Sequence, residues 1–419
     1  MSTAKHLIVS GRWDNNVAIV DLEAALRPEN DGTDAAVISR PRVTPDVDTD
    51  GDGIPDAPAS GQPVAVAVDA GRRLGYVVNH SGGATPAAAA AYQHGHPGLV
   101  TVLDLTKALD PAHDGTLGAV DAFVSTGRTG PVGPALAPDA RHLLVNCGEA
   151  AESEDGGAEI TVIDTETRSA VASIALRENA DHPAEGPSKH DAPHPSFGRY
   201  PNPTGMVISP LRGGVVFTGN GGFSDITVID LQAGLAGSPE AEINRVAIET
   251  GPFGMALSAD GTLVAAAARE SMSTPFEGRT VSIIDVSRAA DGGGDAEVAR
   301  VRVGSDDPGE ATRPFGVAFT PDGRHLVASC FRSNTISVID VADALGGRPA
   351  EVLRIRPPDP PGGQARPRGI VVVGRYACVI GGAKTGPGSS LVWLLDLERG
   401  EIAATVTSVG NESYFLAAY

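Results

Sequence analysis

The chain has 419 residues, 41% of them hydrophobic, and its 52 acidic against 32 basic residues give a formal net charge of −20. This charge repels nucleic acid and anionic membranes. No apolar run approaches the roughly 18 residues of a transmembrane helix. The three cysteines do not suggest a disulfide framework. Because the start lacks the basic and apolar segments of a signal peptide, we expect a soluble, cytoplasmic protein that binds neither nucleic acid nor membrane.

From the first expected strand, at residues 7–10, short apolar runs that end in aspartate recur along the chain. The seven aspartates are Asp21, Asp104, Asp164, Asp230, Asp285, Asp340 and Asp396. Successive aspartates are 55 to 83 residues apart. Self-similarity on this scale is the signature of a repeat architecture, in which each unit buries its apolar face against its neighbours.

The sixth unit shows the pattern of one repeat most clearly. Residues 313–320 form a short strand, 321–324 (PDGR) form a turn, and 325–330 form a second strand. A third strand at 334–340 is rich in β-branched residues, and 352–356 alternates apolar and polar residues as an exposed outer strand does. Four strands joined in this way make one blade of a propeller.

The other units repeat this order, but the chain has seven third strands and only six first strands. It opens on a second strand, and residues 413–419 form an extra strand at the end. We therefore predict an all-β, seven-bladed propeller over residues 1–419, a single domain. Its ring is closed by the C-terminal strand, which pairs into the first blade and removes an open sheet edge.

The repeat, PxGxAxSPDGxxLxVxN followed by xxVxVID, resembles the YVTN-type propeller repeat and is similar to that of lactonase-type seven-bladed propellers. Residues 321–324 with 337–340, and 258–261 with 282–285, carry the resemblance best. It covers nearly the whole chain and implies the fold. It implies little about chemistry, because this scaffold hosts lactonases, lyases, redox enzymes and pure binding proteins, and no catalytic residue is carried over from it.

Strand alternation sorts the loops onto two faces. Loops between third and fourth strands are expected to form single helical turns, and they lie at 22–37, 105–118, 231–241, 286–297 and 341–350. The opposite face carries longer insertions, at 43–62, 80–98, 147–159, 177–202, 271–279, 304–312 and 355–366. Since loops on a rigid scaffold carry function, we expect the site on this second face.

Histidines gather in those longer loops. His142 and His325 recur after the same turn, and they, His6 and His113 are expected to be structural. The others are His80, His94, His96, His182, His190 and His194. With Glu149 they offer acid–base groups, and His80, His94, His96 and His194 offer the imidazoles that a divalent transition metal prefers. The alternative is that they are ordinary surface histidines.

Basic residues lie at strand ends near the axis on the same face. They are Arg12, Arg269, Arg313, Arg332, Arg366, Arg368 and Lys384. In a chain of net charge −20, this clustering predicts a small anionic ligand, because guanidinium groups match carboxylate and phosphate. The alternative is that they only pair with Glu149, Glu270, Glu310 and Glu412. Cys147 and Cys330 end second strands nearby, where each is either a nucleophile or metal ligand, or an inert core residue.

An acidic segment at 46–56, DVDTDGDGIPD, predicts a structural Ca²⁺ site. Its ligands would be Asp48, Asp50, Asp52 and Asp56, because alternating carboxylates around a glycine turn suit an oxygen-coordinated cation. The segment resembles the thrombospondin type 3 calcium repeat and departs from the EF-hand in the place of its last acid. A solvated acidic turn is the alternative.

Together these features favour a propeller enzyme that acts on a small anionic metabolite, using a histidine-bound metal or a His/Glu acid–base pair. Hydrolase, lyase and metal-dependent oxidase chemistry all remain open. The competing hypothesis is a non-catalytic propeller that binds a small ligand or a partner protein.

Overall fold

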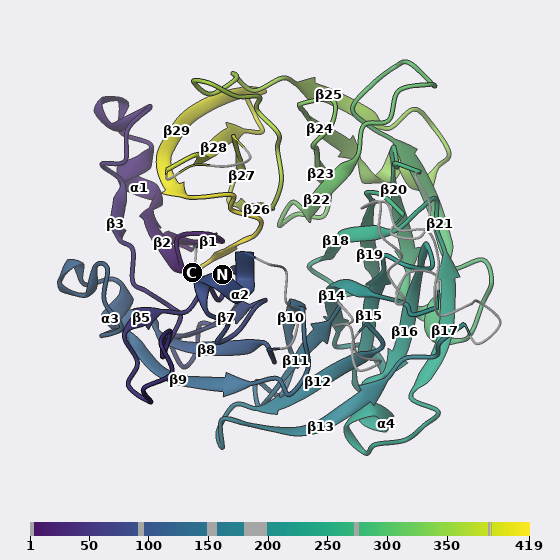
Figure 1. Cartoon of the computed structure of the whole chain (residues 1–419). Coiled ribbons are helices and arrows are strands. Elements are labelled where there is room, and N and C mark those ends of the chain that lie inside the picture. The colour runs from purple at the N-terminus through teal and green to yellow at the C-terminus, as the bar shows by residue number, and fades with distance from the viewer. Residues whose placement is uncertain are drawn as a thin grey trace.

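The computed structural model describes residues 4–90, 96–148, 157–179, 199–271, 276–383, 386 and 388–419. Seven four-stranded antiparallel sheets stand around a central axis as the blades of a propeller (Figure 1). The all-β, seven-bladed prediction is therefore confirmed. In the described part of the chain, no helix is long and apolar enough to cross a membrane.

Each blade is named here in chain order, and its strands run from the axis outward. Blade 1 contains β30 (Leu416–Ala418), β1 (His6–Gly11), β2 (Asn16–Asp21) and β3 (Val37–Ser39). Blade 2 contains β6 (Pro63–Asp69), β7 (Leu74–Asn79), β8 (Leu99–Asp104) and β9 (Val120–Ser125). Blade 3 contains β10 (Pro131–Leu136), β11 (His142–Cys147), β12 (Glu159–Asp164) and β13 (Ser169–Ala175). Blade 4 contains β14 (Pro203–Ser209), β15 (Val215–Asn220), β16 (Asp225–Asp230) and β17 (Glu242–Ala247).

The remaining blades follow the same order. Blade 5 contains β18 (Pro252–Leu257), β19 (Leu263–Ala268), β20 (Thr280–Asp285) and β21 (Glu297–Arg302). Blade 6 contains β22 (Pro314–Phe319), β23 (His325–Cys330), β24 (Thr335–Asp340) and β25 (Glu351–Ile355). Blade 7 contains β26 (Ile370–Val373), β27 (Tyr376–Gly382), β28 (Ser390–Asp396) and β29 (Glu401–Gly410). A small hairpin of β4 (Asp46–Val47) and β5 (Ala57–Pro58) lies between blades 1 and 2 in the sequence.

The C-terminal strand closes the ring as predicted. β30 pairs antiparallel with β1, and Leu7 lies opposite Ala418 and Val9 opposite Leu416. Tyr419 extends the pairing by exchanging backbone hydrogen bonds with His6. Figure 1 shows both chain ends side by side near the axis. The first blade is thus built from both ends of the chain.

The recurrent aspartates act as helix caps. The carboxylates of Asp21, Asp104, Asp230, Asp285 and Asp340 accept backbone hydrogen bonds from the first turns of short helices. These helices are α1 (Leu22–Ala25), α3 (Leu105–Ala108), α4 (Leu231–Leu235), α5 (Val286–Ala290) and α6 (Val341–Leu345). The other helical segments are α2 (Pro86–Ala90) and the 3₁₀ turns η1 (Pro28–Asn30), η2 (Pro111–His113) and η3 (Leu211–Gly213). The predicted helical turns are confirmed.

Blades 3 and 7 use the same aspartate differently. Asp164 and Asp396 are followed by tight turns, and their carboxylates accept the backbone N–H groups of those turns. Each is also paired with an arginine, Arg141 at 2.8 Å and Arg375 at 3.1 Å. These contacts lower the pKa of Asp164 to about 2.

The core lies between neighbouring blades. Seven clusters of buried hydrophobic side chains fill the seven interfaces between adjacent sheets, and the cluster between blades 7 and 1 includes Leu7, Ile380 and Leu416. Each blade therefore depends on both neighbours for burial, as expected for a repeat.

The glycine of the Pro-x-Gly pattern lets the innermost strands approach one another. A Cβ on Gly254 would lie 2.4 Å from the carbonyl oxygen of Phe315 in the next blade, and one on Gly316 would lie 2.6 Å from that of Arg368. A Cβ on Gly133, Gly205 or Gly369 would likewise lie 2.2 to 2.4 Å from a carbonyl oxygen of the next blade. A side chain at this position would push the blades apart.

Candidate functional site

Three sets of equivalent positions surround the axis at the face where the innermost strands begin. The residue after a second strand donates its backbone N–H to the residue before the first strand, as in Phe331 to Arg313 (3.0 Å) and Arg269 to Gly251 (3.0 Å). We call this residue before the first strand the entry position; in blades 2 to 6 it is Gln62, Gly130, Asn202, Gly251 and Arg313. Its counterparts in blades 7 and 1 are Arg366 and Glu412, which lie four residues before β26 and β30. The residue two further along is the inner position, occupied by Val64, Val132, Thr204, Phe253, Phe315, Arg368 and Tyr414.

Aromatic rings meet at the inner position. Phe253 of blade 5 packs edge-on against Phe315 of blade 6, with centroids 4.7 Å apart, and Phe315 packs against Tyr414 of blade 1 at 5.5 Å. Phe253 also stacks on Phe415 at 5.5 Å. Blades 5 and 1 are not neighbours in the ring, so these rings pack across the axis. Blades 2 to 4 offer only valine and threonine at the same position, which makes the face asymmetric.

Arg269 lies over this aromatic cluster. Its guanidinium is 4.2 Å from the Phe253 centroid and 4.9 Å from the Phe315 centroid, a favourable cation–π arrangement. Glu270 pairs with the Arg269 guanidinium at 3.0 Å. The buried Nε of Arg269 nevertheless has no hydrogen-bond acceptor among the described residues. Burial is the main cause that lowers the pKa of Arg269, and repulsion from Arg313 and Arg12 adds to it.

Three further guanidinium groups surround a single ring, Phe331. Arg313, Arg366 and Arg368 lie 5.5, 5.7 and 5.7 Å from its centroid. Arg313 pairs with Glu270 and, at 3.4 Å, with Glu277. Arg366 and Arg368 have no carboxylate within ion-pair distance among the described residues.

Arg368 is the most unusual of these residues. It is 1% exposed, and among the described residues its guanidinium donates to the backbone oxygens of Ser413 (3.4 Å) and Ala383 (3.5 Å). Burial lowers its pKa to about 10. Buried charges in proteins are ordinarily paired, because removing an ion from water is costly.

Residues of the C-terminal segment contact Arg12, another arginine of the cluster. Arg12 donates to Gln62 (3.0 Å) and to the hydroxyl of Tyr414 (2.8 Å), and it pairs with Glu412 at 3.7 Å. Glu412, 5% exposed, accepts a 2.6 Å hydrogen bond from the indole of Trp13. The segment that leads into the closing strand β30 thus supplies an acid and a phenol to the arginine cluster.

The structure brings together Arg12, Arg269, Arg313, Arg366 and Arg368, as the sequence predicts. Arg332 lies at the exposed edge, where it pairs with Glu277. Glu310 is exposed and accepts from Ser305. Lys384 and Glu149 lie outside the described residues. Of the five clustered arginines, Arg12, Arg269 and Arg313 pair with glutamates, and Arg366 and Arg368 have no glutamate within ion-pair distance among the described residues. The small anionic ligand stays a prediction.

The predicted histidine group is only partly described. His80 is 9% exposed, and its Nδ1 lies 3.1 Å from the carbonyl oxygen of Pro131 in the next blade. His96 is exposed. His94, His182, His190 and His194 lie outside the described residues. In the described part of the chain, no histidine belongs to a group that could hold a metal ion, so the transition-metal site stays a prediction.

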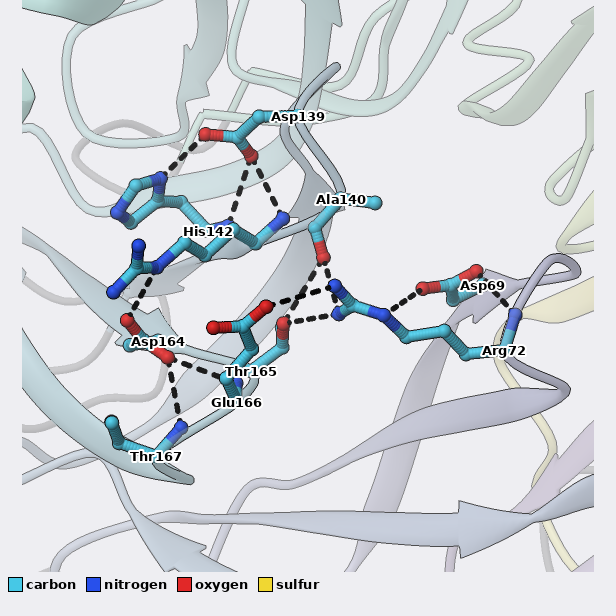
Figure 2. A network of polar contacts seen from close by, with 10 residues as sticks. Asp69, Arg72, Asp139, Ala140, His142, Asp164, Thr165, Glu166 and Thr167 are labelled. Atoms are coloured by element: carbon cyan, nitrogen blue, oxygen red, sulfur yellow. Dashed lines mark hydrogen bonds and ion pairs between the residues drawn. The ribbon is translucent and has the colours of Figure 1, made fainter.

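His142 has the structural place expected of it, on the opposite face. Its Nδ1 lies 2.7 Å from the Asp139 carboxylate (Figure 2). In the same view Arg72 reaches from blade 2 to the Ala140 carbonyl oxygen (2.9 Å) and the Thr165 hydroxyl (2.7 Å) of blade 3. This network joins blades 2 and 3.

Neither cysteine is suited to nucleophilic chemistry. Cys147 and Cys330 are fully buried, and burial raises their pKa values to about 11 and about 12. The thiolate is the reactive form, and at neutral pH it is scarcely populated in either. Burial therefore favours the inert core residue over the nucleophile for both cysteines.

The acidic loop is closed by the β4–β5 hairpin. Ligand oxygens of Asp48, Asp50 and Asp52 lie within 4.8 Å of one another. Asp48 accepts from the backbone N–H groups of Gly51 and Gly53, both at 2.6 Å, which lowers its pKa. Asp56 instead accepts from the backbone and hydroxyl of Thr49. Three of the four predicted ligands converge.

Sequence reasoning overlooked the aromatic cluster. Its signal is the residue at the inner position, which is valine or threonine in blades 2 to 4 and phenylalanine, arginine or tyrosine in the others. Comparing the blades position by position would have found it.

No protein-family model matches the chain, and no curated protein does either. Solved structures do match. A periplasmic gluconolactonase of Pseudomonas aeruginosa, PpgL, is 17% identical with a TM-score of 0.62, covering 98% of each chain. A putative 6-phosphogluconolactonase of Bacteroides fragilis is 14% identical with a TM-score of 0.60, covering 99% of this chain and 98% of that one. Hydrazine synthase of Kuenenia stuttgartiensis is 17% identical with a TM-score of 0.57, covering 90% and 89%. The chain therefore has the seven-bladed propeller fold that lactonase-type proteins share, as its repeat predicts.

Proposed function

We propose that this propeller binds a small anionic metabolite at the arginine–aromatic cluster and hydrolyses it. The observation that carries the proposal is the pair Arg366 and Arg368, two cations beside one ring with no carboxylate partner among the described residues. An anion between them would offset the cost of burying Arg368 and reduce their mutual repulsion.

The surrounding groups support the same ligand. The buried Nε atoms of Arg269 and Arg313 have no acceptor, and buried donors ordinarily have one. Carboxylate and phosphate oxygens accept bidentate hydrogen bonds from guanidinium groups. The aromatic rings supply an apolar floor, where such bonds are stronger than in water.

The reaction class comes from the similar structures. Two of them carry the names of lactonases. A lactone opens when water adds to its carbonyl carbon and the ring C–O bond breaks, leaving a carboxylate, a hydroxyl group and a released proton. Guanidinium groups would stabilise the negative charge that develops on the carbonyl oxygen.

A general acid–base residue is also required. Glu270, Glu412 and His80 are the described candidates. His94, His96, His190, His194 and Glu149 remain proposed members of the same site. A divalent metal, if the histidines bind one, would supply Lewis-acid polarisation of the carbonyl.

Titration of the protein with gluconate, citrate and inorganic phosphate, and assays of the opening of glucono-lactone and of its anionic 6-phospho derivative, test the proposal. We expect Arg368→Gln to weaken binding of the best anion about tenfold or more, since a hydrogen bond to a charged group is worth about 1.5–3 kcal/mol. The control is Arg300→Gln, on the outer strand β21, where Arg300 pairs with Glu297.

Equal binding by the wild type and Arg368→Gln would refute the site. Anion binding without turnover of any lactone would refute the hydrolase and favour the non-catalytic binding propeller.

We also propose that the acidic loop binds one Ca²⁺ through Asp48, Asp50 and Asp52. The convergence of their oxygens supports it, and oxygen ligands suit this hard cation. Its role would be structural, because the loop belongs to the connection between blades 1 and 2.

A further inference from the structure

The entry position has an unusual backbone. Non-glycine residues occupy it with positive φ in five blades: Gln62 (55°), Asn202 (50°), Arg313 (52°), Arg366 (42°) and Glu412 (51°). In blade 3 the same position is Gly130, with φ of 61°. The ring thus requires a left-handed turn here in most blades.

Side chains are disfavoured at such a turn. An L-residue with positive φ brings its Cβ close to the following carbonyl oxygen. In four of the five cases the next residue is proline, which further restricts the residue before it to extended conformations. Glycine has neither a Cβ nor this cost, and Gly130 shows that the propeller accepts it. The turn explains the positive φ at the entry position. It does not explain why residues other than glycine occupy it.

Four of the five side chains belong to the arginine cluster. Gln62 accepts from Arg12, and Glu412 pairs with Arg12. Arg313 pairs with Glu270. The contacts of these three side chains offset part of the strain of the positive φ.

Arg366 has no such partner. Its guanidinium contacts Phe331, together with those of Arg313 and Arg368, and has no carboxylate within ion-pair distance in the described part of the chain. Arg366 also raises the electrostatic cost of Arg368, since its charge lowers the pKa of that group. The Arg366 backbone N–H donates to the Asn334 side chain at 3.0 Å, but its positive φ and its charge beside Arg368 are both unfavourable to folding.

We infer that Arg366 is a ligand-recognition residue that is retained at the expense of stability, and that the entry residues of blades 1, 2, 6 and 7 form the rim that selects the ligand. Strained residues persist where the strain serves function. The inference rests on the proposed anion site. Within that site, it assigns the discrimination between ligands to residues at the entry position.

Three variants separate backbone strain, charge and binding. Arg366→Gly removes the strain and the charge, and Arg366→Ala removes the charge alone. Arg73→Gly is the matched control, because Arg73 has φ of 57° and is exposed in a turn of blade 2 at the opposite face.

Without ligand, we expect Arg366→Gly to raise the melting temperature by about 1 to 2 °C, and Arg366→Ala by less, since a domain of this size shifts by about 1 °C for each kcal/mol. For citrate, measured by calorimetric titration, we expect both variants to lose about tenfold or more in affinity. Arg73→Gly should gain about 1 °C and bind citrate as the wild type does.

Each other result has a defined meaning. If the wild type binds citrate and both Arg366 variants bind it equally well, the inference is wrong, while a loss of affinity in Arg368→Gln still supports the anion site. If Arg366→Gly melts below the wild type, Arg366 is structural and the inference is wrong. If the wild type binds none of citrate, phosphate and gluconate, the proposed function and this inference fall together.

Discussion

At the scale of single residues, burial decides which predicted groups have chemistry. Cys330 and Arg368 both lie near the axis, and both are fully enclosed. The thiol becomes inert because burial favours its neutral form. The guanidinium keeps its proton at physiological pH even with a pKa of about 10, so it remains a charge that an anion can neutralise.

The thiols give a pH prediction. Burial raises the pKa values of Cys147, Cys330 and Cys378 from 9.0 to about 11, 12 and 12. A raised thiol pKa contributes stability that is complete below pH 9 and is lost as pH rises toward 12. We expect little thiolate absorbance from the native protein at pH 10, and most of the signal of three thiolates after denaturation in urea. Full absorbance of the native protein at that pH would contradict the buried assignment.

At the scale of elements, one residue type serves two local structures. The aspartate that ends each third strand caps a short helix in five blades and a tight turn in blades 3 and 7. In both cases a carboxylate accepts backbone N–H groups that would otherwise lack partners. The hydrogen bonds of this aspartate are therefore similar in all blades, although the loop that follows the third strand differs in length.

The acidic loop gives a prediction at the same scale. If it binds Ca²⁺, the ion stabilises the folded state by mass action, by about 2.7 kcal/mol at a concentration one hundred times the dissociation constant. We expect Ca²⁺ to raise the melting temperature, EDTA to reverse the change, and Asp50→Asn to abolish it. Asp46→Asn is the control, since Asp46 pairs with Arg42 and lies outside the converging group. An unchanged melting temperature of the wild type would refute the site.

At the scale of the whole molecule, ring closure and the candidate site share one segment. Residues 411–418 contain the closing strand and also Glu412, Tyr414 and Phe415 of the cluster. Closing the ring therefore completes the site, and the two cannot form independently.

Deletion of residues 411–419 should cost far more than an ordinary terminal truncation. It removes the innermost strand of blade 1 and exposes the edge of β1, which invites association between chains. We expect a large fall in melting temperature and oligomers in size-exclusion chromatography. A synthetic peptide of residues 411–419, added in excess, should restore part of the stability. A truncated protein that stays monomeric with the melting temperature of the wild type would contradict the closure.

The sequence by itself determined the fold and the face of the candidate site. Apolar runs ending in aspartate, Pro-x-Gly and Pro-Asp-Gly turns are local signals, and their count fixed seven blades and a shared first blade. Strand alternation then placed Arg12, Arg269 and Arg366 on one face. Contacts across the axis depended on the tertiary structure, because they join residues hundreds of positions apart, such as Phe253 with Phe415. Only the closed ring decided that Arg313 has carboxylate partners, that Arg366 and Arg368 have none among the described residues, and that Cys147 and Cys330 are buried, since burial and pairing arise from all blades at once.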